Sequence, residues 1–298
     1  MPEVSVVIPT YNSARYLVEA VRSVLAQTFE DLEVIVVDDG STDDTASVID
    51  GIDPRVRYVR QENSGVSVAR NNGVAESSAR YVAFLDADDT WVPEKLTKQV
   101  EALRANPGYR LCYTAFTVTD SELKPIEVRR PRQRGTALET LLLHGNFVGG
   151  GSSTVLCERE VFTKAGGFDP SLSQCADWDM SVRLAALTDF LYLDEALVNY
   201  RQHGMNMSSD PRLLEDDSVR VLEKGFATPG IDSAITSKRR RALARNDMVL
   251  AGTYFQAGRY RDFARCAARS VSRDPRRVSY LAGFPVRVAR RMSRRTGP

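Results

Sequence analysis

The fold is decided by one stretch, Tyr81-Val82-Ala83-Phe84-Leu85-Asp86-Ala87-Asp88-Asp89, in which five apolar residues lead directly into three carboxylates. A short, continuous apolar run is typical of a strand buried on both faces. Neighbouring carboxylates repel one another, and burying them is costly unless a positive group compensates. Hard divalent cations prefer oxygen ligands and complete their coordination with water and phosphate. The stretch therefore indicates a metal and phosphate site at a strand end, with a solvated acidic turn as the alternative.

The residues before this stretch alternate between strand-like and helix-like patterns. Apolar runs at 4–8, 32–37 and 55–59 alternate with amphipathic segments at 13–27, 43–52 and 66–77. This rhythm predicts an α/β fold, a Rossmann-like, mostly parallel sheet flanked by helices. Polar clusters at 9–12, 38–41 and 86–89 follow three of the strands. Since ligands bind beyond the carboxyl ends of parallel strands, we expect these clusters to share one rim.

The patterns after Asp89 are less regular. We expect a helix from Pro93 to Asn106, a strand over 111–119, a polar and basic mobile loop over 121–135, and a strand pair around 190–200. The helix that follows Asp177 is predicted to turn Met180, Leu184 and Leu187 inward. Two helices after residue 237, joined at Gly258, predict a helical hairpin.

Length and composition suit a globular protein, with 298 residues of which 43% are hydrophobic. No apolar run approaches the ~20 residues that cross a bilayer, and no leader pattern opens the chain, so we expect a cytoplasmic location. The four cysteines are far apart and lack a CxxC pair, which argues against a zinc site or a disulfide framework.

Charge divides the chain near Asp210. By count, about 20 Lys and Arg face 31 Asp and Glu up to that residue, and about 20 face 8 after it. We therefore expect an acidic, metal-using domain over 1–210 and a basic helical region over 211–298. The basic and apolar residues 284–295 either contact an anionic inner membrane face or form a solvated terminus. No nucleic-acid-binding motif accompanies the positive charge.

Further candidate site residues follow from position. Asp38 and Asp39 lie on the expected rim, where a base or ribose offers N–H and O–H donors. Arg70 can pair with Asp39, face the base, or form an ordinary surface ion pair. Asp177 either caps its helix or serves as a general base. His203 is a surface histidine or an additional metal ligand beside a diphosphate.

Taken together, these motifs resemble the family 2 glycosyltransferases of the GT-A fold over residues 3–208. The resemblance rests on the segments at 6–12, 36–43, 69–73, 84–89, 166–169, 177–179 and 200–203. It implies an inverting transfer from a nucleotide-diphosphate sugar, with a UDP-sugar expected, to an acceptor hydroxyl that can be lipid-linked. It also implies a role in bacterial-type polysaccharide, glycolipid or natural-product glycan synthesis.

The resemblance also assigns roles to single residues. The positions expected to hold the nucleotide sugar are Pro9, Thr10, Tyr11, Asp38, Asp39, Asn63, Arg70, Asp86 and Ala87. Asp88, helped by His203, is expected to bind Mn²⁺ or Mg²⁺, and Asp177 matches the general base. Ala176 departs from the family pattern, which often has Glu there, and this puts acceptor positioning in doubt.

Two other functions fit parts of the sequence. The run Asp86-Ala87-Asp88-Asp89-Thr90 also matches the DxDxT pattern of haloacid-dehalogenase-like phosphatases, in which Asp86 would be the nucleophile. That fold normally opens with the motif, whereas here three strand and helix pairs precede it. A nucleotide-sugar-binding protein without catalysis is the other alternative, suggested by Ala176.

Overall fold

The structure is a computed structural model that describes residues 1–203 and 210–283. These residues divide into two compact units, the first with 1–141 and 146–203, the second with 142–145 and 210–283. All strands assigned in the described residues belong to the first unit, and helices α8 to α12 belong to the second.

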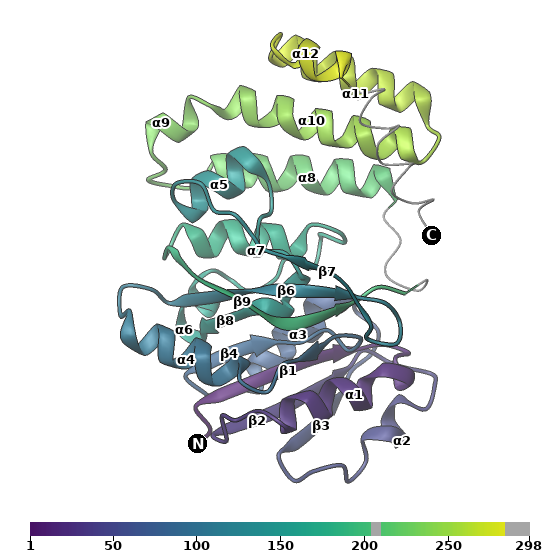
Figure 1. The fold of residues 1–298 in the computed structure, drawn as a ribbon, viewed down its shortest axis with the longest axis vertical. Coiled ribbons are helices and arrows are strands. Elements are labelled where there is room, and N and C mark those ends of the chain that lie inside the picture. Colours follow the sequence, from purple (N-terminus) through teal and green to yellow (C-terminus); the bar gives the residue numbers. More distant parts are fainter. Residues whose placement is uncertain (204–209, 284–298) are drawn as a thin grey trace. The chain divides into compact units, whose positions relative to one another are not determined.

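The first unit combines strands and helices in the predicted order (Figure 1). Its strands are β1 (Val4–Thr10), β2 (Leu32–Asp38), β3 (Val56–Arg60), β4 (Tyr81–Phe84), β5 (Thr90–Trp91), β6 (Leu111–Thr119), β7 (Pro125–Arg129), β8 (Val155–Glu158) and β9 (Phe190–Arg201). Its helices are α1 (Ala14–Leu25), α2 (Thr45–Ile49), α3 (Val66–Ala75), α4 (Lys95–Ala105), α6 (Arg159–Lys164) and α7 (Ala176–Ala185), with a 3-10 turn, η1 (Gly151–Thr154). Helix α5 (Ala137–His144) begins in this unit.

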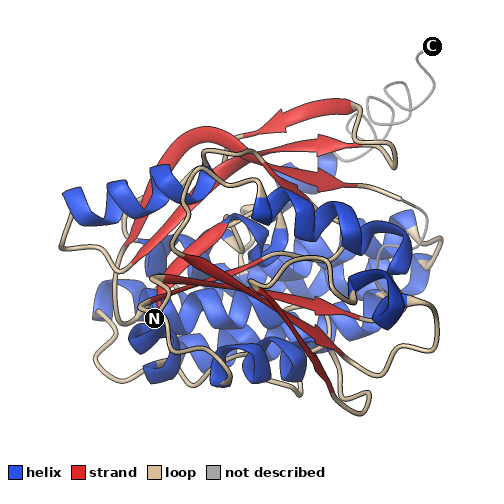
Figure 2. Cartoon of the chain, turned by 90° about the horizontal axis from the view of Figure 1, so that it is seen from below, coloured by secondary structure: helices blue, strands red, loops and turns tan. Residues whose placement is uncertain are grey.

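The described strands form one twisted sheet in the order β3-β2-β1-β4-β8-β6-β9-β5, with β7 paired to β6 (Figure 2). Strands β1 to β4 pair in parallel, and β6 pairs in parallel with β9. Strand β8 is antiparallel to both of its neighbours, and β5 and β7 are antiparallel to their partners. Helix α3 packs on β1 and β2, and α1 packs on β1 and β5. The prediction of a mostly parallel, helix-flanked sheet is confirmed.

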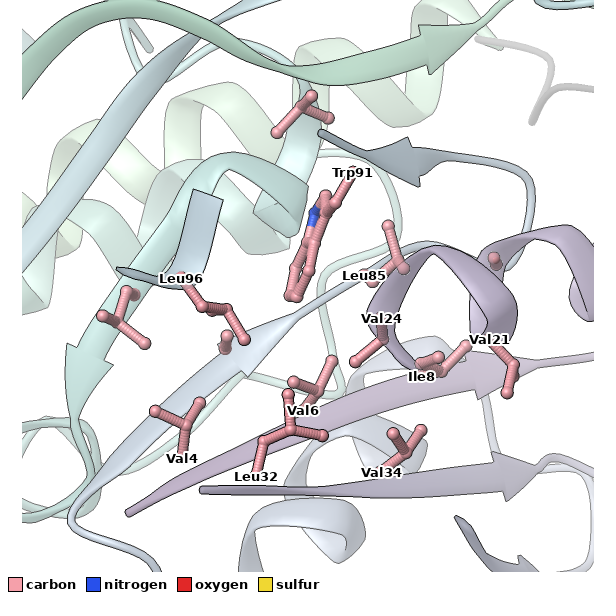
Figure 3. Packing of buried hydrophobic residues seen from close by; sticks show 14 of the residues in the cluster. Val4, Val6, Ile8, Val21, Val24, Leu32, Val34, Leu85, Trp91 and Leu96 are labelled. Atoms are coloured by element: carbon pink, nitrogen blue, oxygen red, sulfur yellow. The ribbon is translucent and has the colours of Figure 1, made fainter. Parts of the chain in front are cut away.

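The core of this unit explains why the strands are continuously apolar. All seven residues of β1 are buried, and α1 buries five side chains on one face. Figure 3 shows Val6 and Ile8 of β1 near Val24 of α1, with Leu85 and Trp91 above them. Burying such side chains contributes about 1.5–3 kcal/mol each, which holds β1 and its helices in a fixed relation.

Strand register places the predicted polar clusters on one rim. Thr10 pairs with Asp38, and Asp38 pairs with Arg60 on the next strand. The amide of Leu85 donates to the Val7 carbonyl at 3.0 Å, so Asp86 leaves the sheet at the same edge. The three clusters therefore share one edge, as the sequence predicted.

Three local predictions were wrong. The expected mobile loop over 121–135 contains strand β7, whose residues are exposed but paired to β6. The expected strand pair around 190–200 is the single strand β9. Leu187 lies after α7 and is 51% exposed, so it does not face inward, whereas Met180 and Leu184 are buried.

The second unit is helical in its described residues. Its helices are α8 (Pro211–Phe226), α9 (Ser233–Thr236), α10 (Arg239–Gln256), α11 (Tyr260–Arg273) and α12 (Arg277–Ala282). The turn at Gly258, with φ +71°, joins α10 and α11 in the predicted hairpin. Glu215 of α8 accepts from Tyr254 and Arg265 at 2.7 Å each, which ties the three longest helices together. In the part of the chain that the structure describes, no helix has the length and hydropathy to span a bilayer.

Candidate active site

Asp38 and Asp39 organise the loops of the rim. Asp38 is fully buried, and its carboxylate accepts from the Ser41 amide at 2.8 Å and from the Tyr58 hydroxyl. Asp39 accepts from Gln61 Nε2 at 2.7 Å and from the amides of Ser64 and Gly65 at 2.8 Å. These bonds hold the segment that leads into α3 against the end of β2.

The other expected nucleotide residues differ in exposure. The Thr10 side chain is buried, and its Oγ1 has no hydrogen-bond partner among the described residues. Pro9 is buried in β1, and Ala87 packs into the core. Tyr11 is 50% exposed, and Asn63 donates to the Asp39 carbonyl at 3.0 Å. Tyr11 and Asn63 are thus open to solvent, whereas Pro9 and Ala87 are buried.

Arg70 joins two carboxylates that are far apart in sequence. It donates from Nη2 to Asp86 at 2.6 Å and from Nη1 to Asp177 at 3.1 Å, and its guanidinium lies 5.0 Å from the Phe168 ring centroid. Burial alone lowers the pKa of Arg70, but Asp86 and Asp177 outweigh it and the net shift is upward, so this buried side chain stays charged. Of the three alternatives for Arg70, pairing with Asp39 and an ordinary surface ion pair are both wrong, because Arg70 is buried and bonds to Asp86 and Asp177.

Gly73 permits this placement of Arg70. A Cβ added at Gly73 would lie 2.3 Å from Val7 Cγ1, which is closer than any packed pair of carbons allows. Helix α3 can therefore approach β1 only because residue 73 lacks a side chain. The close approach brings Arg70, one turn earlier, beneath the strand ends.

Asp177 faces the site, and Asp179 does not. Asp177 lies in the first turn of α7, and its Oδ1 accepts from Arg70 and from Ser152 Oγ at 2.7 Å. Asp179 is buried and pairs one turn along the same helix with Arg183, at 2.6 Å. Trp178 is also buried and donates to the Leu141 carbonyl at 3.2 Å. Of the three residues, Asp177 alone combines exposure with a position at the rim.

A turn that was not predicted to be part of the site forms hydrogen bonds with Asp86, Asp89 and Asp177. We call Gly150–Ser153 the serine turn. Ser152 donates to Asp177, whereas Ser153 donates to Asp89 at 2.7 Å and accepts from the Asp86 amide at 3.1 Å. Three glycines preceding two serines were the available signal, but the sequence gives no distance from them to Asp177.

Gly151 lies close to both Asp86 and Asp177. Its φ is +58°, and a Cβ there would lie 3.0 Å from Asp86 Oδ2 and 3.7 Å from Asp177 Oδ2. The two outer oxygens therefore face the same glycine. Burial raises the pKa of Asp86, an effect that Arg70 opposes and Asp177 reinforces, so the acids are electrostatically linked.

Asp88 and His203 form the part of the site that suits a cation. His203 Nε2 lies 2.9 Å from Asp88 Oδ2, and both side chains are partly exposed. Two ligand atoms held about 2.1 Å from an octahedral ion at right angles are about 3 Å apart, so the pair fits adjacent coordination positions. The described residues hold no group of three or more acidic, His or Cys side chains arranged around a common point. Water and substrate oxygens would have to complete the coordination.

Arg201 stabilises this end of the site. Its side chain is 3% exposed and donates to the Asp88 carbonyl at 2.8 Å, to the Ser121 carbonyl at 2.6 Å and to Glu19. Its amide also donates to Asp89 at 2.9 Å. Arg201 was not predicted as a site residue, although its bond to the Asp88 carbonyl holds the backbone that carries Asp88.

The sheet and its acidic rim define a glycosyltransferase of the GT-A fold. The model of the Glycosyl transferase family 2 matches residues 5–164, and the chain belongs to this family. The resemblance drawn from the motifs is thereby confirmed, as are the predicted fold class and the prediction that the protein is an enzyme.

Relatives in sequence are also glycosyltransferases. An uncharacterised glycosyltransferase of Rickettsia prowazekii is 32% identical over 232 residues, which is 76% of this chain and 71% of the relative. Chondroitin synthase of Escherichia coli is 30% identical over 78% of this chain, but the match spans only 34% of that enzyme. Nothing in these matches favours the phosphatase interpretation of Asp86.

Solved structures show the same fold at low sequence identity. TarS 1–349 of S. aureus in complex with UDP superimposes with a TM-score of 0.66 at 18% identity, covering 90% of both chains. The mannosyltransferase PcManGT of Pyrobaculum calidifontis, in complex with GDP-Man and Mn²⁺, gives a TM-score of 0.64 at 18% identity, covering 97% of this chain and 80% of that one.

Proposed function

We propose that this glycosyltransferase moves a hexosyl group from a nucleotide-diphosphate sugar to an acceptor hydroxyl, with inversion at the anomeric carbon. The observation that carries the proposal is the arrangement around Arg70, which holds both Asp86 and Asp177 close to Gly151. One acid then lies on the donor side and the other on the acceptor side of a single space.

In this mechanism Asp177 is the general base. Its Oδ1 is occupied by Arg70 and Ser152, and its Oδ2 has no hydrogen-bond partner among the described residues. Oδ2 would take the proton of the acceptor hydroxyl as that oxygen attacks the anomeric carbon. The bond from the anomeric carbon to the diphosphate breaks in the same step, and its electron pair leaves with the phosphate. A single displacement of this kind inverts the stereocentre.

On the donor side, the rim residues would bind the nucleotide. Tyr11 and Asn63 are exposed, and Asn63 donates to the backbone carbonyl of Asp39; Asp86 would approach the ribose. Asp88 and His203 would hold Mn²⁺ or Mg²⁺, which when bound neutralises charge on the leaving diphosphate. A UDP-sugar is the proposed donor, supported by the TarS structures in complex with UDP and UDP-GlcNAc. The mannosyltransferase in complex with GDP-Man and Mn²⁺ supports a nucleotide-diphosphate sugar and a divalent ion in general.

We also propose a cytoplasmic setting in bacterial-type polysaccharide, glycolipid or natural-product glycan synthesis, with a lipid-linked acceptor. Chondroitin synthase and a putative teichuronic acid glycosyltransferase of Bacillus subtilis, 44% identical over 39% of this chain, support the polysaccharide assignment. Residues 1–210 would form the catalytic domain and 211–298 a basic helical region. The part of this region proposed to contact a membrane, residues 284–295, lies outside the described residues.

The test combines binding and turnover. Thermal shift of the purified full chain with UDP, GDP and their sugars, with and without Mn²⁺, identifies the donor, and nucleotide release then measures turnover. Asp177→Asn should remove turnover while keeping the nucleotide-dependent thermal shift. The matched control is Asp50→Asn, the same change at an exposed carboxylate after α2, which should stay near wild type. Full turnover by the Asp177→Asn protein would exclude Asp177 as the base.

A further inference from the structure

Asp177 is held by a feature of this chain that the general mechanism does not require. Ser152 is 5% exposed, and its hydroxyl donates to Asp177 Oδ1 at 2.7 Å. Arg70 donates to the same oxygen at 3.1 Å. Two donors on one carboxylate oxygen fix the rotation of the carboxyl group, and the other oxygen is left facing the space beside Gly151.

The backbone of Ser152 is itself tightly fixed. The preceding residues Gly150 and Gly151 have φ of +72° and +58°, in the left-handed region that favours glycine. The next residue, Ser153, is fully buried between Asp89 and the Asp86 amide. The serine turn is thus anchored through Ser153 on the acidic stretch after β4, while Ser152 donates to Asp177.

From this geometry we infer that Ser152 is a positioning residue, which holds the general base with Oδ2 directed at the acceptor. The inference rests on the proposed function, because it assumes that Asp177 is the base. Ser152 does not touch the substrate in this account. It acts through Asp177, and the serine turn makes the orientation of the base depend on the same loop that secures the donor-side acids.

The size of the effect follows from the bond and its surroundings. A hydrogen bond to a charged group contributes about 1.5–3 kcal/mol, which corresponds to roughly 10- to 100-fold in a rate. A cavity of about 20 Å³ adjoins Ser152 and Asp177, which is room for about one water. Because a water there can replace part of the lost donor, we expect Ser152→Ala to lower kcat about tenfold.

The experiment measures nucleotide release from the donor that gives the largest thermal shift, with water as the acceptor. In the Ser152→Ala protein, kcat should fall about tenfold while the donor KM and the Mn²⁺-dependent thermal shift with UDP stay at wild-type values. Ser152→Thr, which keeps the hydroxyl, should restore most of kcat. Ser181→Ala is the matched control, because Ser181 is a buried serine one turn from Asp177 that lines the same cavity.

The possible results distinguish a failure of the proposed function from a failure of the positioning role of Ser152. A wild-type protein without turnover on any donor would overturn the proposed function and this inference with it. An active wild type with an equally active Ser152→Ala protein would overturn the positioning role alone. A fall in kcat that comes with a raised donor KM and a reduced UDP thermal shift, and that threonine does not rescue, would show a structural role and also overturn it.

Discussion

Arg70→Met should destabilise the first unit by about 3 kcal/mol. The side chain is buried and makes two charged hydrogen bonds, to Asp86 and Asp177. Methionine keeps most of the volume and removes both bonds. Breaking a buried ion pair from one side costs about 3–5 kcal/mol, since the partner charge remains. The side chains of Asp86 and Asp177 are 26% and 33% exposed and can regain water, which places the expected value at the low end of that range.

The measurement is urea unfolding followed by tryptophan fluorescence. Both tryptophans of the chain, Trp91 and Trp178, lie in the first unit, so the signal reports that unit. The control is Lys164→Met, which removes an exposed pair with Glu160 at 2.7 Å and should cost under about 0.5 kcal/mol. If both substitutions lower the free energy of unfolding equally, Arg70 does not hold the two acids together as argued.

Three further changes test other parts of the structure. Gly73→Ala should cost about 1–3 kcal/mol by the same assay, because its Cβ would overlap a β1 methyl, whereas Gly108→Ala has open space and should be neutral. Burial lowers the pKa of Lys95 from 10.5 to about 7, so above pH 7 the unfolded chain binds more protons than the folded chain. The free energy of unfolding should therefore rise toward pH 9, by up to about 1.4 kcal/mol per pH unit. A Lys95→Met protein that shows the same rise would contradict the assignment of this effect to Lys95. Asp88→Asn, or EDTA added to the wild type, should remove the Mn²⁺-dependent part of the thermal shift with UDP, and an unchanged shift would refute Asp88 as the ligand.

The shared edge of the polar clusters could be predicted because each strand is recognisable from a short segment of the sequence. β1, β2 and β4 are continuous apolar runs that end in polar clusters, and parallel pairing alone brings those ends together. The burial of these strands and the shared edge of their polar clusters follow from the apolar runs and from parallel pairing. The helical hairpin of α10 and α11 was likewise predicted, because Gly258 separates two segments with helical patterns.

The errors arose where distant segments decide the local structure. The sequence pattern predicted a strand pair around 190–200. In the structure the register between β6 and β9 shifts there, from Leu193 opposite Thr114 to Ala196 opposite Ala115, so the strand continues through a bulge. Strand β7 has no apolar core face and exists through its pairing with β6.

The pairing of Arg70 with Asp177 could not be predicted from the sequence. Asp39 lies closer to Arg70 along the chain than Asp177 does, but its carboxylate already accepts hydrogen bonds from the amides of Ser64 and Gly65, just before α3. Asp177 is 107 residues away from Arg70 in the chain, and only the packing of α7 beside η1 brings it within 3.1 Å. Spacing along the chain cannot supply a contact of that kind.

The three carboxylates of the acidic stretch are compensated in different ways. Asp86 is compensated by Arg70. Asp89 is buried, accepts from Ser153 and from the Arg201 amide, and has its pKa raised well above the ordinary value, first by burial and then by the neighbouring Asp86 and Asp88. Asp88 lies 2.9 Å from His203 Nε2, and a divalent ion held by this pair would add positive charge at the proposed diphosphate position.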